Sequence, residues 1–426
     1  MLPANCLRRI KLTMHNEKKS KFLRTIKNFG PGMVTGAADD DPSGVATYTI
    51  AGALYGYKFL WTSWLTWPLM ACVQMMCADI ALASEKSLTE AIIQKYSRSL
   101  AAPVIFALFT ANILNVAADL SAMADALAIL TGHPSLLYLV LTGIIVTASI
   151  ILFTYRTIAR TLTWLTFFLL AYVFTAMKVE TNWEQLIKGS FYFRPPESSA
   201  EWSMIVALLG TTISPYLFFW QSSQELEELR TNKNFDYANV KRLRKWDILL
   251  GTFISNLIMY FIIWTAAGSL HASGIFNIEN SAQAARALEP LLGHASLVVY
   301  TIGILGVGML AIPTLVGSSS LAVADLFRWQ SGLNKKWNEA QAFYSTLCLG
   351  MCIAIILNLF QFNPIKALFY SAVVNGLLSP VLIVLCLLVS RDSNIMKNRP
   401  LGKPTALLAS LTALVMLCSA VGMFLF

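Results

Sequence analysis

Apolar stretches long enough to cross a bilayer recur along almost the whole chain, with short polar segments between them. A transmembrane helix needs about 20 predominantly apolar residues, and eleven windows of the sequence reach that length. The windows are 31–56, 58–82, 99–127, 134–155, 158–178, 202–222, 246–269, 295–320, 340–360, 364–390 and 403–426. The pattern predicts an all-α polytopic membrane protein with eleven transmembrane helices.

Two of these windows carry helix-breaking residues at their middle. The first reads PGMVTGAADDDPSGVATYTIAGALYG, and the sixth reads WSMIVALLGTTISPYLFFWQSSQE. Proline removes a backbone donor and clashes with the preceding turn, so each helix should unwind at Pro42 or Pro215. Unwound backbone is tolerated at membrane depth only where it faces protein or a polar cavity. The two breaks are therefore candidates for one shared site.

The interrupted windows are the first and sixth of ten, with an eleventh appended. Because five spans is an odd number, the second half of the chain starts from the opposite side of the membrane. This arrangement is typical of a transporter with an inverted repeat and a site near the bilayer midplane. We expect a LeuT-type 5+5 fold with discontinuous helices 1 and 6. Its parts are a basic tail (1–30), a first five-helix repeat (31–180), an extracytoplasmic loop (181–201), a second repeat (202–390), and a final loop and helix (391–426).

Composition agrees with a membrane protein, because 56% of the residues are hydrophobic and only 13% are charged. Soluble domains have about 25% charged residues, so a water-soluble enzyme is excluded. The net charge of +9 is explained by basic residues in the loops on one side of the membrane and does not indicate a nucleic-acid partner. If the N-terminus is cytoplasmic, 26 of the 32 Lys and Arg residues lie on the cytoplasmic side, as positively charged inner loops require. We expect an integral protein of the bacterial cytoplasmic (inner) membrane, with an extracytoplasmic C-terminus.

Three consecutive carboxylates, Asp39, Asp40 and Asp41, give the strongest chemical signal. An ionised carboxylate at the centre of a transmembrane helix costs at least ~2.5 to 3.5 kcal/mol, and three neighbours repel one another. Asp41 is the best candidate for a metal ligand because it adjoins the break at Pro42, and Asp40 is the second. The predicted site is completed by oxygen atoms: freed backbone carbonyls and the hydroxyls of Ser43, Thr211 and Ser214. Hard divalent cations such as Mg²⁺ prefer such oxygen ligands.

Further polar residues lie inside other windows. Asp119, in the middle of the third window, is a candidate proton acceptor or gate, or else a carboxylate that fixes helix packing. Asn375 either lines the permeation path or makes interhelical hydrogen bonds, and Asp39 joins these two as a proton or gate candidate. Glu225, Glu227 and Glu228 follow the sixth window and are expected to form a solvated helix end. No histidine falls inside an apolar window.

With these residues in view, the chain resembles the Nramp family of divalent-metal transporters, and more closely a bacterial branch with GAADDDPSG in the first span and GTTISPYLFFWQ in the sixth. The family pattern Asp-Pro-Gly-Asn is matched by Asp41, Pro42, Ser43 and Gly44. The family's sixth-span motif Ala-Thr-Val-Met-Pro-His-Asn lies opposite residues 211–217. The resemblance implies a metal-binding Asp41, backbone ligands at Ala38 and Thr211, and a third-span aspartate at Asp119.

The departures from the family pattern bear on the ion. The family's metal-binding Asn is Gly44 here, its soft Met ligand is Ser214, its sixth-span His is Tyr216, and a third-span Glu is Ala122. Losing a thioether removes a preference for soft ions, so the sequence leans towards Mg²⁺. The family resemblance implies symport with protons, but the loss of His and Glu predicts weak coupling.

The leading hypothesis is therefore a secondary transporter that moves Mg²⁺, Mn²⁺ or a related divalent cation. One alternative is a transporter of amino acids or other organic solutes on the same fold, although three aspartates would repel a substrate carboxylate. Another is a receptor or scaffold that has lost transport. We expect no enzymatic activity and no cofactor. The expected partners are divalent metal ions and the lipid bilayer, with no nucleic acid and no obligate protein partner.

Overall fold

The structure is a computed structural model that describes residues 36, 39–153, 157, 167–231, 237–333, 335–360 and 363–426. The predicted basic tail (1–30) and Ala38 lie outside these residues, as do residues 158–166 of the predicted fifth span. Every regular element within the described ranges is helical. The prediction of an all-α fold is confirmed.

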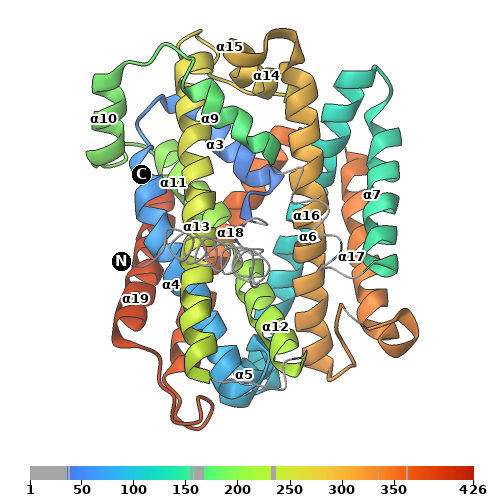
Figure 1. Cartoon of the computed structure of the whole chain (residues 1–426). Coiled ribbons are helices and arrows are strands. Elements are labelled where there is room, and N and C mark those ends of the chain that lie inside the picture. The colour runs from blue at the N-terminus through green and yellow to red at the C-terminus, as the bar shows by residue number, and fades with distance from the viewer. Residues whose placement is uncertain are drawn as a thin grey trace, which may run out of the picture.

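Within these ranges, nine helical spans are long and apolar enough to cross a membrane. They run roughly parallel in one bundle (Figure 1). Their helices are α4 (Trp61–Ser84), α6 (Arg98–Thr131), α7 (Ser135–Leu152), α11 (Ser199–Thr212) with α12 (Pro215–Thr231), α13 (Tyr237–Ala266), α16 (Ser296–Phe327), α17 (Gln341–Leu357), α18 (Pro364–Ser390) and α19 (Lys403–Leu425). The first and fifth predicted spans contribute the shorter helices α3 (Pro42–Tyr55) and α9 (Leu170–Ala176). The total of eleven stays a prediction.

Both predicted helix breaks are present. Asp41 has extended backbone angles (φ −78°, ψ 170°) and forms the N-cap of α3, which begins at Pro42. In the sixth span α11 ends at Thr212, Ile213 leaves the helical region (φ −115°, ψ 54°), and α12 begins at Pro215. Proline fits the first turn of a helix because it needs no backbone donor there. The first break therefore starts α3, and the second ends α11 and starts α12.

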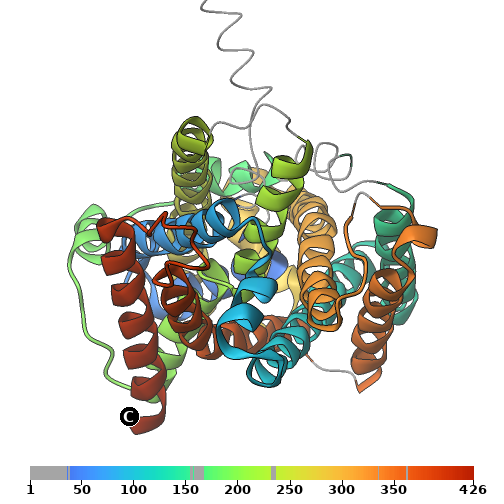
Figure 2. The same cartoon turned by 90° about the horizontal axis from the view of Figure 1, so that it is seen from below.

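Long neighbours surround the two interrupted helices. The most extensive contacts in the bundle join α6 to α16 and α11 to α18, and α3 packs against α13, α18 and α11. The bundle is widest between α19 on one side and α7 and α17 on the other (Figures 1 and 2). Nearly every residue of α3 is buried, as is 89% of the apolar window in the sixth span. Both breaks thus lie in the interior.

Short helices cover the two ends of the bundle. The helix α5 (Leu88–Tyr96) lies at the lower end of Figure 1, and the helices α10 (Trp183–Phe191), α14 (Ser281–Ala285) and α15 (Glu289–Leu292) lie at the upper end. Two ion pairs hold the loop after α18 against the α5 end, Lys95 to Asp392 at 2.7 Å and Lys397 to Glu85 at 2.9 Å. The hydrogen bond from Lys95 holds the pKa of Asp392 below its usual value. These loops were predicted to share the cytoplasmic side, and they share one end of the structure.

Helices extend beyond the apolar windows in two places. The helix α13 begins at Tyr237 rather than at residue 246, because its backbone hydrogen bonding starts before the apolar run does. The predicted loop 181–201 contains α10, which Asn182 caps by accepting from the Gln185 amide and which buries Leu186. Hydropathy measures which residues suit lipid, so it misses the polar turns of a helix outside the membrane.

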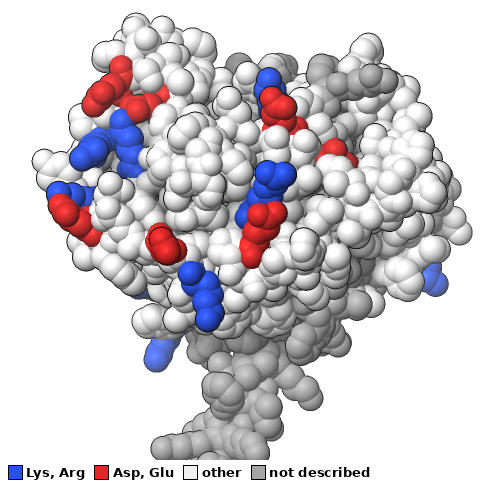
Figure 3. All heavy atoms as spheres, turned by 90° about the horizontal axis from the view of Figure 1, so that it is seen from above, with Lys and Arg blue, Asp and Glu red and all other residues white. Residues whose placement is uncertain are grey.

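The end of the molecule that carries α14 and α15 shows acidic and basic side chains in mixed groups (Figure 3). Its ion pairs include Lys188 with Glu184 at 2.5 Å and Lys58 with Glu201 at 2.5 Å. Opposite charges at such distances largely cancel beyond a Debye length. The described part of this face therefore offers no broad field of one sign to attract ions.

The tight crossing of α11 and α18 depends on Gly210. A Cβ atom at this position would lie 2.0 Å from the Ala372 carbonyl oxygen and 2.4 Å from the Gly376 nitrogen. We expect Gly210→Ala to lower the free energy of unfolding by about 1–3 kcal/mol through overpacking, measured as a lower melting temperature in detergent. The control is Gly303→Ala, where the nearest atoms lie at 3.9 Å. Equal melting of both variants would contradict this prediction.

Candidate functional site

Asp41 lies where the first span breaks, with no exposed surface. Its Oδ1 accepts hydrogen bonds from the Ser43 hydroxyl at 2.6 Å and the Gly44 amide at 2.7 Å. Its Oδ2 accepts from the Asn115 side-chain amide at 3.1 Å. A carboxylate at a helix N-terminus also neutralises the positive end of the helix dipole. One buried charge is therefore held by the first turn of α3 and by a side chain of α6.

Ser43 joins the two breaks. Its hydroxyl lies 3.4 Å from the Thr211 hydroxyl in the last turn of α11, while it donates to Asp41. Both residues are fully buried. The predicted site residues Asp41, Ser43 and Thr211 thus come together from segments that are 168 positions apart in the sequence.

Ser214 occupies the second break itself. Its hydroxyl donates to the carbonyl oxygens of Gly210 at 2.6 Å and Thr211 at 2.9 Å, which are among the carbonyls that the end of a helix leaves unpaired. The carbonyl oxygen of Ile213 accepts from the Ser379 hydroxyl at 2.7 Å. The break thus presents backbone carbonyls from the negative end of α11, and Ser214 is directed towards that backbone.

One face of α18 lines both breaks through Ser371, Asn375 and Ser379, which are spaced by four residues and so lie on one side of the helix. Ser371 donates to the Asn115 side-chain carbonyl at 2.6 Å, and Ser379 bonds to the second break. Asn375 lies between them, fully buried, and neither atom of its amide group has a hydrogen-bond partner among the described residues. Buried amides are rarely left without a partner, so Asn375 marks a place where a ligand or water would complete the site.

Asp39 and Asp40 face a different helix. The Ser255 hydroxyl of α13 donates to Asp39 at 2.7 Å and lies 3.1 Å from Asp40. Both carboxylates are buried, and one oxygen of Asp39 has no hydrogen-bond partner in the described structure. The three consecutive aspartates are therefore divided between two environments, one at α13 and one at α6.

Asp119 is fully buried on α6, one helical turn after Asn115. Neither of its oxygens has a hydrogen-bond partner among the described residues. Asp41 and the backbone of Ser43 lie close enough to affect it electrostatically. Asp119 therefore adds a second carboxylate near the first break.

The described residues contain no group of three or more His, Cys, Asp or Glu side chains that could hold a metal ion. His271 lies at the end of the π-helix after α13 (Ala267–His271), where its Nδ1 is 2.8 Å from the Ala53 carbonyl oxygen. Ala38 lies outside the described residues. The candidate site thus has single carboxylates among hydroxyl, amide and carbonyl oxygens, and Asp41 within it has no exposed surface.

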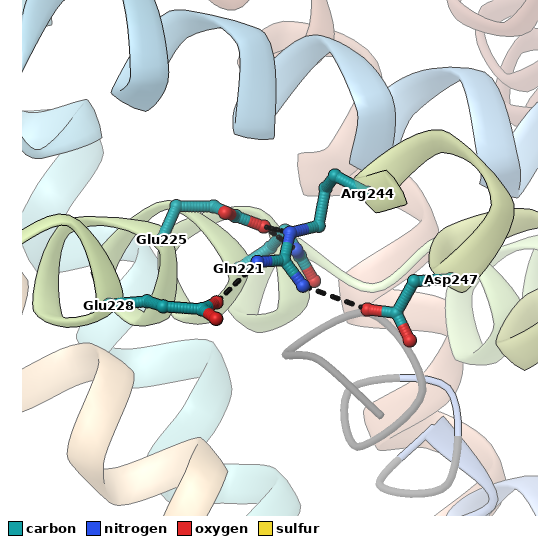
Figure 4. A network of polar contacts seen from close by, with 5 residues as sticks. All are labelled: Gln221, Glu225, Glu228, Arg244 and Asp247. Carbon is teal, nitrogen blue, oxygen red and sulfur yellow. Dashed lines mark hydrogen bonds and ion pairs between the residues drawn. The ribbon is translucent and has the colours of Figure 1, made fainter. Parts of the chain in front are cut away.

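Between this site and the α5 end of the bundle, Arg244 of α13 holds three carboxylates (Figure 4). Its Nε lies 2.6 Å from Glu225 and its Nη1 2.9 Å from Asp247, and it also pairs with Glu228. Gln221 donates to Glu225 at 2.7 Å. The expectation of a solvated helix end is wrong for Glu225, which is 1% exposed, because α12 turns this residue towards Arg244. The cluster fixes the lower half of the sixth span to α13.

Sequence reasoning did not find Asn115, Ser255, Ser371, Ser379 or Arg244 as parts of these networks. The spacing of Ser371, Asn375 and Ser379 was a readable signal, since it places three polar residues on one face of an apolar helix. The partners of Asn115 and Ser255 could not be read from the sequence, because those contacts join distant segments.

These features define a class of protein: a membrane transporter with two discontinuous helices that meet at a buried polar site. A family model described as "Natural resistance-associated macrophage protein-like" (Nramp) matches residues 32–425, and the chain belongs to this family. Its members are transporters and not enzymes. The chain is similar to the "Divalent metal cation transporter MntH" of Klebsiella pneumoniae (strain 342), with 30% identity over 300 residues, covering 68% of this chain and 69% of the relative.

Solved structures share the fold. The Eremococcus coleocola manganese transporter, in complex with an aromatic bis-isothiourea substituted compound, has a TM-score of 0.71 at 17% identity, covering 94% of this chain and 87% of that chain. Mhp1, a nucleobase-cation-symport-1 family transporter in a closed conformation, has a TM-score of 0.60 at 12% identity, covering 93% and 92%. Both likenesses concern the fold, and they confirm the predicted LeuT-type architecture.

The Arg244 cluster generates a prediction about stability. Arg244→Met leaves the buried Glu225 carboxylate without its cation, which costs about 3–5 kcal/mol when one partner of a buried pair is removed. We expect a clearly lower melting temperature in detergent, and recovery of most of the loss when Glu225→Gln is added. Lys188→Met serves as control, because the Lys188–Glu184 pair is exposed. An Arg244→Met protein that melts with this control would contradict a structural role for the cluster.

Proposed function

We propose that this protein carries hard divalent cations, Mg²⁺ or Mn²⁺ or a related ion, across the bacterial inner membrane. The observation that carries the proposal is the buried carboxylate of Asp41 at the junction of the two breaks. The oxygens of Ser43 and Thr211 lie around it. Carboxylate, hydroxyl and carbonyl oxygens suit hard cations. Membership of the Nramp family and the similarity to a divalent metal cation transporter support the same substrate class.

The site also suits transport rather than permanent binding. Mg²⁺ keeps several of its waters and is bound through one or two carboxylates, and a cage of three or more acidic ligands would hold the ion too tightly to release it. The negative end of α11 and the carbonyls at the second break favour a cation at the midplane, as in other transporters with broken helices. With Ser214 at the second break, no thioether favours a softer ion there.

The membrane orientation is inferred from the charge of the loops at the two ends of the bundle. The loop after α18 carries three basic residues, Arg391, Lys397 and Arg399, against one acidic residue, Asp392, and it lies at the α5 end of the bundle. Positively charged loops remain in the cytoplasm, so we place this end there. In this orientation Arg244 and its three carboxylates lie between the ion site and the cytoplasm, where they close the inner route.

The central test is Asp41→Asn in proteoliposomes loaded with a fluorescent indicator for Mg²⁺ or Mn²⁺. We expect uptake to fall to the background of empty liposomes, because the neutral amide removes the one charge placed at both breaks. The control is Asp125→Asn, since Asp125 accepts from the Ser281 backbone at 2.9 Å and an Asn oxygen can do the same. Wild-type uptake in the Asp41 variant would refute the site, and no divalent uptake by the wild type would refute the function.

Proton coupling should be weak. Ala122 and Tyr216 occupy positions where the family resemblance implies Glu and His, so the remaining candidates are Asp119 and the pair Asp39 and Asp40. We expect little acidification during metal uptake, measured with a pH-sensitive dye trapped in the liposomes. Strong metal-dependent acidification would contradict this. Its loss in Asp119→Asn would then assign the proton to Asp119, and its loss only in Asp39→Asn or Asp40→Asn would assign it to the carboxylates at Ser255.

A further inference from the structure

The two oxygens of Asp41 are not equally available to an ion. Oδ1 is occupied by two short hydrogen bonds, from Ser43 at 2.6 Å and from the Gly44 amide at 2.7 Å. Oδ2 accepts a single, longer bond of 3.1 Å from Asn115. An incoming cation therefore meets Asp41 most readily at Oδ2, where Asn115 is the side chain already in contact.

Asn115 currently directs its amide nitrogen at Asp41. Its carbonyl oxygen accepts from the Ser371 hydroxyl at 2.6 Å, and the residue is fully buried. An –NH₂ group can donate to a carboxylate but cannot ligate a metal ion, whereas the amide carbonyl oxygen is a good ligand for hard cations. The observed orientation thus satisfies Asp41 directly, and the opposite orientation would serve a bound ion.

The contacts of Ser371 permit that exchange without leaving a polar group of Asn115 or Ser371 unpaired. Its hydroxyl also lies 2.8 Å from the Leu368 carbonyl oxygen, so the hydroxyl can donate its hydrogen bond there alone. The Ser371 oxygen is then free to accept from the Asn115 nitrogen, because a hydroxyl both donates and accepts. A half-turn about the terminal torsion of Asn115 therefore swaps its oxygen and nitrogen, and every polar group retains a partner.

We propose that Asn115 is a ligand of the transported cation, and that its side-chain amide turns over when the ion binds to Oδ2 of Asp41. This inference rests on the proposed function and adds a ligand from α6 to it. Within the first turn of α3, position 44 is close to Asp41, but it is glycine and has no side chain that could supply an amide. A Cβ there would lie 3.2 Å from the Thr211 hydroxyl and 3.3 Å from the Tyr48 ring.

The same exchange would link the ion to three helices. In the structure Asn115 of α6 connects Asp41 at the start of α3 to Ser371 of α18. When its oxygen turns to the ion, its nitrogen would donate to Ser371 instead of Asp41. The ion thus replaces a direct bond between Asn115 and Asp41 with a bridge through the metal.

The test measures cation binding to the purified full-length protein in detergent by calorimetry, with the chlorides of Mg²⁺, Mn²⁺ and Cd²⁺. The variants are Asn115→Leu and Asn115→Met, which both lack the amide donor but differ in that Met offers a thioether. The control is Asn112→Met, because Asn112 lies on the same helix but bonds to Ser319 at 2.7 Å and faces α16. Melting curves check folding, and Asn115→Ala replaces the Leu variant if that protein does not fold.

We expect Asn115→Leu to weaken the binding of Mg²⁺ and Mn²⁺ by about tenfold or more, as loss of a group at a metal site does. Asn115→Met should weaken Mg²⁺ equally but bind Cd²⁺ more tightly than the Leu variant does, because a thioether favours the softer ion. The Asn112→Met control should bind all three ions as the wild type does.

Each of the other outcomes would contradict a different part of the proposal. Wild-type Mg²⁺ affinity in Asn115→Leu would show that Asn115 is not a ligand. Equal weakening of all three ions in the Leu and Met variants would show that Asn115 only positions Asp41 by donating to it. If the wild type binds no divalent cation, the proposed function fails before Asn115 is tested, whereas binding that Asp41→Asn abolishes keeps the function whatever Asn115 does.

Discussion

The structure depends on the cost of keeping a carboxylate inside a membrane. A lone ionised Asp at the centre of a transmembrane helix is unfavourable, yet Asp41 is fully buried. It is tolerated because the first span breaks at this residue, so that the start of α3 supplies a backbone donor and Ser43 supplies a hydroxyl. The break in the first span, the N-cap of α3 and the candidate ion site therefore all lie at Asp41.

This arrangement explains why the surrounding helices carry polar residues at particular positions. Asn115 on α6, Ser371 on α18 and Thr211 on α11 each contribute a polar atom to the first break or to a group that touches it. Ser379 does the same for the second break. Buried backbone and side-chain polar groups need such partners, so each break recruits hydroxyl and amide groups from its neighbours. Some of these oxygens are the ones that the proposed function assigns to a cation.

A second buried charge cluster lies away from the ion site and has a different character. Around Arg244 the acidic groups are paired with a guanidinium, and the cluster joins α12 to α13. Around Asp41 no Lys or Arg forms an ion pair within the described structure. A carboxylate without a protein cation suits the proposed cation site, whereas the carboxylates paired with Arg244 hold two helices together.

The sequence by itself determined the fold class, the two breaks and the residues at them. Apolar windows report which segments suit lipid, and the effects of Pro42 and Pro215 on the backbone are local, so these features need no knowledge of distant contacts. Local information also placed Asp41 beside a break. It could not show that Glu225 is buried, because its environment depends on Arg244, which is 19 positions away.

Only the tertiary structure decided which side chains meet. It divided Asp39 and Asp40 from Asp41 by placing Ser255 next to the first two and Asn115 next to the third. Asn115 and Ser371 are 256 positions apart, and each is compatible with many helix arrangements when taken alone. Helix packing selects one arrangement because small residues such as Gly210 allow close backbone contact only at particular crossings. The composition of the candidate site was local information, and the arrangement of its polar groups was a property of the packed bundle.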